Sequence, residues 1–86
     1  MEKLVIKILV LTDQTQLISQ IEEVGAEIGE PDCRLTEPFV IKEDGTLYPW
    51  LIDITDDNKF MMSSDKILTM ADPKSSVLKK YNDLLQ

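Results

Sequence analysis

The chain has 86 residues, of which 43% are hydrophobic and 29% charged, and its formal net charge is −7. A chain of this length and composition is typical of one small globular domain, whose thin core buries roughly 60–65% of the unfolded surface. The negative charge argues against indiscriminate binding to nucleic acids or anionic membranes, because it repels phosphate at long range.

Residue types that commonly carry enzymatic chemistry are scarce. The chain has no histidine and a single cysteine, Cys33. The lack of histidine removes the commonest general base and most zinc sites. A single cysteine excludes an intramolecular disulfide and favours a reducing, cytoplasmic setting. We therefore expect a non-enzymatic protein with no cofactor and no metal, in which Cys33 is a small apolar core residue.

Two other polar clusters are better interpreted as surface features. The acidic stretch Asp53–Asn58 lacks the glycine and the distal glutamate of a calcium-binding loop, and is typical of a solvated turn. A Ser-Lys nucleophile at Ser63, Ser64 and Lys66 would need a desolvated lysine, whereas this stretch is polar. Both observations strengthen the expectation that the protein is not an enzyme.

The N-terminal third begins with an apolar segment that ends at Leu11. Lys7 interrupts this segment, which is too short to span a membrane. It also lacks a signal-peptide pattern. Leu4–Leu11 is predicted to be a strand with apolar residues on both faces, and is therefore covered on both sides. The next segment, Gln16–Val24, fits two structures: its apolar residues have helical spacing, but a strand would also place Leu17 and Ile21 on one face.

The central part of the chain predicts a β-hairpin. The strands Cys33–Lys42 and Leu47–Ile54 flank an Asp-Gly turn, which tolerates the positive φ of a tight hairpin. Pro38 is expected at an edge, a bulge or a strand end, because proline lacks a backbone donor. The second strand is expected to present one apolar face, formed by Tyr48, Trp50, Ile52 and Ile54.

The C-terminal part predicts two short strands and a helix. The strands Phe60–Met62 and Ile67–Met70 flank a tight polar loop. Asp72 is a suitable N-cap for the helix and Pro73 a suitable first residue. The helix carries one apolar stripe at helical spacing, made of Val77, Leu78, Tyr81, Leu84 and Leu85.

The segment Phe60–Met70 resembles the second Sm motif, which is a short strand, a tight turn and another short strand. Nearly the whole chain is similar to small Sm-like proteins of marine cyanophages, through Glu37–Ile41, Tyr48–Leu51 and Ala71–Pro73 followed by Val77, Tyr81 and Asn82. The resemblance implies a single Sm-like domain over residues 1–86. In that domain a strongly bent five-stranded antiparallel barrel covers residues 3–71, with Gln16–Val24 as a strand, and a C-terminal α-helix covers residues 73–85.

The resemblance also implies partners and a location. Sm-like subunits join into rings, here of about five to seven copies, by pairing the fourth strand of one subunit with the fifth of the next. Such rings bind single-stranded RNA, so a homo-oligomer that binds single-stranded RNA or DNA in phage nucleic-acid processing is expected, in the host cytoplasm and away from membranes. The expected nucleic-acid-binding residues are Ser63, Ser64 and Lys66 at the pore, then Arg34, Tyr48 and Trp50.

Several residues depart from the RNA-binding Sm pattern. Ser63 and Ser64 replace an Arg-Gly turn, and the acidic loop Gly25–Asp32 has no asparagine. Tyr48 and Trp50 also fit packing in a core or a subunit interface, since they fall on an apolar strand face. The alternative function is therefore an acidic protein-interaction or scaffold module that does not bind nucleic acid.

Overall fold

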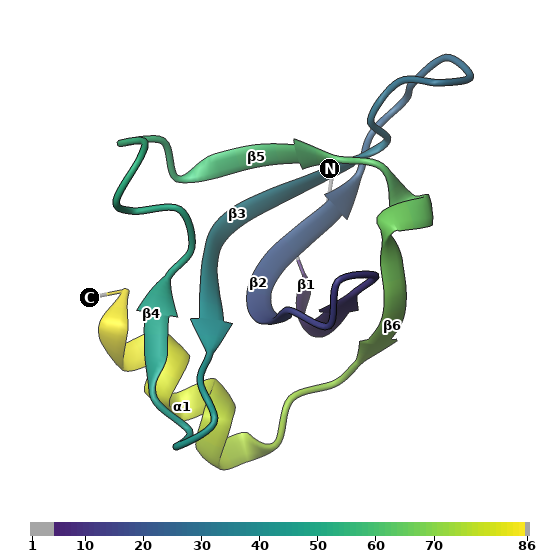
Figure 1. The fold of residues 1–86 in the computed structure, drawn as a ribbon. Coiled ribbons are helices and arrows are strands. Elements are labelled where there is room, and N and C mark those ends of the chain that lie inside the picture. The colour runs from purple at the N-terminus through teal and green to yellow at the C-terminus, as the bar shows by residue number, and fades with distance from the viewer. Residues whose placement is uncertain (1–4, 86) are drawn as a thin grey trace.

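The structure is a computed structural model that describes residues 5–85. Lys3 and Leu4, at the start of the predicted barrel and first strand, lie outside the described residues. The elements along the chain, shown in Figure 1, are β1 (Val5–Leu11), β2 (Gln16–Glu23), β3 (Cys33–Ile41), β4 (Leu47–Pro49), β5 (Lys59–Met62), the 3₁₀ turn η1 (Ser64–Lys66), β6 (Ile67–Ala71) and α1 (Ser75–Leu84). The prediction of a mainly β protein with a C-terminal helix is confirmed.

All pairings in the sheet are antiparallel. The strand order is β4-β3-β2-β1-β6, and β5 also pairs with β3, which gives a six-stranded sheet. This sheet is open, since β4 and β6 stand at its two ends. The expected five-stranded barrel therefore differs from the observed sheet in its strand count and in its closure. The additional strand arises because β3 takes a separate partner along each half of its length.

The change of partner along β3 occurs at Glu37 and Pro38. Before this point Cys33–Thr36 pair with β5, and after it Phe39–Ile41 pair with β4. The β2–β3 register also shifts here, and Glu37 adopts a positive φ of 53°. Proline cannot donate to the ladder, so the break occurs where the sequence already lacks a donor. The predicted irregularity at Pro38 is therefore a bulge that bends the strand.

The ambiguous segment Gln16–Val24 is a strand over most of its length. β2 pairs with β1 from Val5↔Ile21 to Val10↔Gln16. The helical alternative was wrong because β2 is buried on both faces: Leu17 and Ile21 belong to one hydrophobic cluster, and Ile18 to a second. Burial on both faces produces apolar spacing that imitates a helix.

The hairpin turn between β3 and β4 is confirmed. Gly45 has a φ of +86°, and the Lys42 amide donates to the Thr46 carbonyl at 2.9 Å. The second strand, predicted over Leu47–Ile54, is much shorter and ends at Pro49. The Trp50 amide then donates to the Pro38 carbonyl, and Leu51 turns the chain with a φ of +64°.

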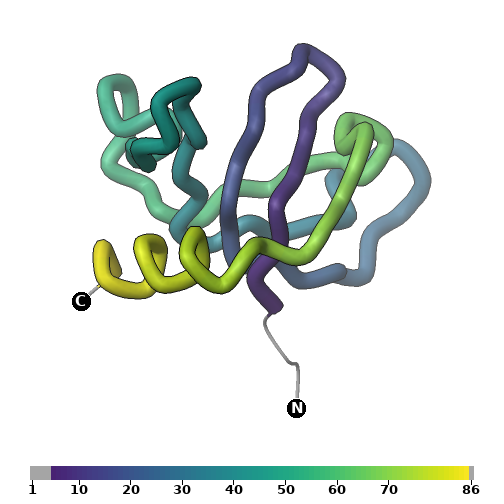
Figure 2. The backbone as a smooth tube through the Cα atoms, turned by 90° about the horizontal axis from the view of Figure 1, so that it is seen from below, coloured from purple at the N-terminus to yellow at the C-terminus, as the bar shows by residue number. Residues whose placement is uncertain are grey.

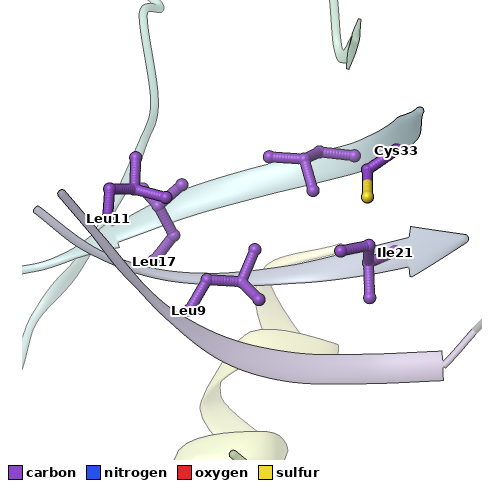
Figure 3. Close-up of a cluster of buried hydrophobic side chains, with 6 residues drawn as sticks. Leu9, Leu11, Leu17, Ile21 and Cys33 are labelled. Atoms are coloured by element: carbon purple, nitrogen blue, oxygen red, sulfur yellow. The ribbon is translucent and has the colours of Figure 1, made fainter. Parts of the chain in front are cut away.

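Two hydrophobic clusters lie on opposite faces of β1, as its sequence predicted. The first, shown in Figure 3, contains Leu9, Leu11, Leu17, Ile21, Cys33 and Leu35. The second contains Ile18, Phe39 and Tyr81, with Ile6 and Ile8 packed against it. Cys33 is therefore a core residue, and burial raises the pKa of its thiol.

Helix α1 lies along one side of the sheet (Figure 2). Tyr81 of its apolar stripe belongs to the second cluster, and Val77 and Leu85 pack against that cluster. The helix begins at Ser75, after an N-cap at Lys74, and so it starts later than the predicted Asp72-Pro73. The Asp72 carboxylate instead accepts a hydrogen bond from Lys7 on β1. Tyr81 is fully buried, whereas Leu84, predicted on the apolar stripe, is half exposed. Within residues 5–85, no helix has the length and apolar character to cross a membrane.

Candidate functional site

The turn between β5 and β6 brings together three of the predicted site residues, Ser63, Ser64 and Lys66. The Lys66 amide donates to the Ser63 carbonyl at 3.0 Å, which closes the 3₁₀ turn η1. The Lys66 carbonyl in turn accepts from the Thr12 amide at 3.0 Å, which ties this turn to the β1–β2 connection. Ser64 and Lys66 are exposed. The structure therefore holds these side chains on one short and well-anchored turn.

An acidic side chain already occupies the hydrogen-bonding groups of Ser64. Asp32 accepts from the Ser64 amide at 2.7 Å and from the Ser64 hydroxyl at 2.8 Å. The amide and then the hydroxyl lower the pKa of Asp32 below its ordinary value, so this carboxylate stays ionised. A phosphate at the Ser64 hydroxyl would displace Asp32 and meet its negative charge.

Arg34 is engaged elsewhere. On the β2–β3 ladder it lies opposite Glu22, and its Nε and Nη2 atoms are 2.7 and 2.6 Å from Glu22 Oε1. The Glu22 side chain is only 10% exposed, so this ion pair is partly buried, and losing Arg34 would leave the Glu22 charge poorly solvated. We conclude that Arg34 acts first as a structural partner of Glu22.

Tyr48 and Trp50 lie across the molecule from the turn, at β4 and just after it (Figure 1). The Tyr48 hydroxyl donates to Asp53 at 3.2 Å, and the nearby Asp53 charge raises the pKa of Tyr48. Trp50 packs edge-on against Phe60, with ring centroids 5.6 Å apart, and borders the first hydrophobic cluster. The six predicted residues therefore do not form one continuous surface.

A groove of about 680 Å³ lies beside the turn. Its walls come from β6, from the start of β1, from the end of β2 and from the start of β3, and include Val5, Ile21, Val24, Cys33 and Ile67–Met70. Its charged lining residues are all acidic, namely Glu22, Glu23 and Asp32. Apolar walls with an acidic rim suit a protein segment better than a phosphate backbone.

The strands on either side of the turn have exposed apolar side chains. Within residues 5–85, β5 pairs only with β3 and β6 only with β1, so each strand has one free edge. Met61 on β5 is 50% exposed, and Leu68 and Met70 on β6 are 60% and 48% exposed. In the sequence, both strands are short and apolar on both faces. A short strand at the edge of a sheet cannot bury both faces, so some of its apolar side chains stay exposed.

The sequence was compared with known proteins. No curated protein matches the chain. Residues 4–86 match DUF6561, a family of unknown function. Because this match covers nearly the whole chain, the protein belongs to the DUF6561 family.

Proposed function

We propose that the protein is a non-enzymatic, self-assembling interaction module, in which the free edge of β5 in one copy pairs with the free edge of β6 in the next. The observation that carries this proposal is the pair of short open edges on either side of η1, each with exposed apolar side chains. Unpaired strand edges are normally protected or paired, and pairing them between copies satisfies their backbone groups and buries Met61, Leu68 and Met70.

An Sm-like arrangement is the form of assembly that we propose. Two features support it: β6 and β5 lie next to the first and third strands, and a three-residue 3₁₀ turn joins them. Such head-to-tail pairing generates a closed ring, here of about five to seven copies, when the rotation between copies closes. The groove beside β6 then receives the apolar side chains of the neighbouring β5.

Light scattering over a range of protein concentrations tests the assembly. We expect a stable mass of about five to seven subunits for the unchanged protein, and a shift to monomer on the double substitution Met61→Asp and Leu68→Asp. Both side chains are half exposed or more, so the subunit itself should fold normally. The double variant should become monomeric because burying two unpaired carboxylates in each interface costs far more free energy than the apolar contacts return.

The matched control is Ile54→Asp, which adds a charge at a side chain 78% exposed in the loop after β4. We expect it to leave the mass unchanged. A strictly monomeric unchanged protein would contradict the proposal, and so would a double variant that assembles as well as the unchanged protein.

Single-stranded nucleic acid is a second candidate ligand of the assembled protein. The observation that favours it is Lys66, whose exposed side chain forms no ion pair within residues 5–85 and would be repeated around a ring. The acids beside Ser64 weigh against it, and for this reason a protein partner is our first choice.

Anisotropy of a labelled RNA or DNA single strand, titrated at several salt concentrations, separates the two candidates. If the strand binds at the turn, Lys66→Glu should weaken binding by about ten-fold or more and reduce its salt dependence. Lys74→Glu, which makes the same charge change before α1, should have a much smaller effect. If no binding is detected at low salt, the nucleic-acid candidate is excluded and only the protein-interaction role remains.

A further inference from the structure

We infer that the loop Leu51–Asp57, which follows β4, is a docking surface for a positively charged amphipathic segment of another protein. This surface lies apart from the β5 and β6 edges and goes beyond the proposed assembly. Two isoleucines in this loop project into solvent: Ile52 is 46% exposed and Ile54 is 78% exposed. Tyr48, which is 40% exposed, reaches the same loop through its hydroxyl bond to Asp53.

The loop is held in place by backbone hydrogen bonds, although its apolar side chains are exposed. The amides of Ile54 and Thr55 both donate to the Leu51 carbonyl at 3.1 Å. The Asp57 amide donates to the Thr55 hydroxyl at 3.1 Å. A partner therefore meets a surface that is already ordered, which lowers the entropic cost of binding.

Leu51 at the start of the loop has a φ of +64°. This conformation is unfavourable for a side chain with a Cβ atom, and costs on the order of 1–3 kcal/mol when the surrounding structure maintains it. Trp50 supplies that constraint, because its amide bonds to Pro38 and its ring packs against Phe60. An extended strand here would need no strain. A strained turn that exposes isoleucines is typical of a recognition loop.

Charge determines the kind of partner. Residues 51–58 contain three aspartates, Asp53, Asp56 and Asp57, and no lysine or arginine. All three are exposed; Asp53 lies between the two isoleucines, and Asp56 and Asp57 follow them. A partner with apolar side chains for Ile52 and Ile54 and with lysine or arginine beside them satisfies both features of the surface. Lys42 lies over the Tyr48 ring, 4.7 Å from its centroid, but the three aspartates outnumber it, so an acidic partner or a nucleic acid meets net repulsion here.

The test uses two fluorescein-labelled synthetic peptides of about 18 residues with the same leucine stripe at helical spacing, one carrying lysine and the other glutamate at the remaining positions. We expect saturable binding of the Leu/Lys peptide to the full chain, and binding at least about ten-fold weaker for the Leu/Glu peptide. The double substitution Ile52→Ser and Ile54→Ser should weaken Leu/Lys binding by about ten-fold or more.

The control is Ile28→Ser, because Ile28 is fully exposed and is also flanked by acids, Glu27 and Glu30, in a different loop. It should change the dissociation constant less than about two-fold. Amide chemical-shift changes on adding the Leu/Lys peptide should centre on residues 51–57. Absence of binding, equal binding of both peptides, an equal loss with Ile28→Ser, or shifts confined to the β6 groove would each overturn the inference. Self-assembly is tested separately, by the solution mass, so a failure of either proposal can be told from a failure of the other.

Discussion

Replacing Tyr81 by phenylalanine is expected to lower the free energy of unfolding by about 1–3 kcal/mol, although only one oxygen atom is removed. The Tyr81 hydroxyl donates to the Glu37 carbonyl at 2.7 Å and accepts from the Gln20 amide at 3.3 Å. These backbone groups lie where the β2–β3 register shifts. Phenylalanine takes this partner away from both part-buried groups, which the tyrosine hydroxyl bridges.

Removing the ring as well should cost more. Tyr81→Ala is expected to lower the free energy of unfolding by about 3–5 kcal/mol, because it also deletes the edge-on contact with Phe39 at the centre of the second cluster. Urea denaturation at a fixed protein concentration measures both changes. The control is Tyr48→Phe, which removes an exposed hydroxyl and should stay within about 0.5 kcal/mol of the unchanged protein. Equal effects at Tyr48 and Tyr81 would contradict the bridging role.

Leu9→Ala is expected to lower the free energy of unfolding by about 2–5 kcal/mol. Leu9 is fully buried in the first cluster, and its strand pairs with β2 on one side and β6 on the other. The cavity therefore lies where three strands meet, and these strands have little freedom to move inward. The same denaturation experiment should show a change below about 1 kcal/mol for Leu84→Ala, a leucine that is half exposed on α1.

The size of the chain makes the Leu9 effect severe. At about 0.05–0.15 kcal/mol per residue, the whole protein has a stability of about 4–13 kcal/mol. Leu9→Ala then removes a large part of that reserve, and assembly would return some of it in a concentration-dependent way. A Leu9→Ala protein as stable as the Leu84→Ala protein would contradict the close packing of the first cluster around Leu9.

Local sequence predicted the turns better than the strand ends. Asp44-Gly45 located the hairpin because its conformation depends on the turn residues themselves. The strand after it was predicted too long, because Tyr48, Trp50, Ile52 and Ile54 alternate as in a strand. Strand β4 stops at Pro49 because Pro38, which lies opposite Trp50, has no amide to complete the next pair, and because Leu51 then takes a φ of +64°. Local alternation reveals neither feature.

In the candidate site, too, the local turn could be predicted from the sequence and the contacts between distant residues could not. The position of the Ser63–Lys66 turn followed from polar residues between two short apolar runs. The engagement of Arg34 by Glu22 and of Ser64 by Asp32 did not, because both pairs depend on which strands and loops meet in space. Similarly, Lys7 on β1 holds Asp72, so the residue best suited to cap α1 lies before the helix.

The hydroxyl of Tyr81 has a consequence for how the chain reaches its native state. Its partners Gln20 and Glu37 lie 61 and 44 residues earlier in the sequence, and β1 likewise pairs with β6, which comes late in the chain. Contacts between such distant residues slow folding, because long loops must close before the contacts form. During synthesis the β2–β3 bend therefore stays incomplete until residue 81 has been added, and until then early strands are open to pairing with other nascent chains.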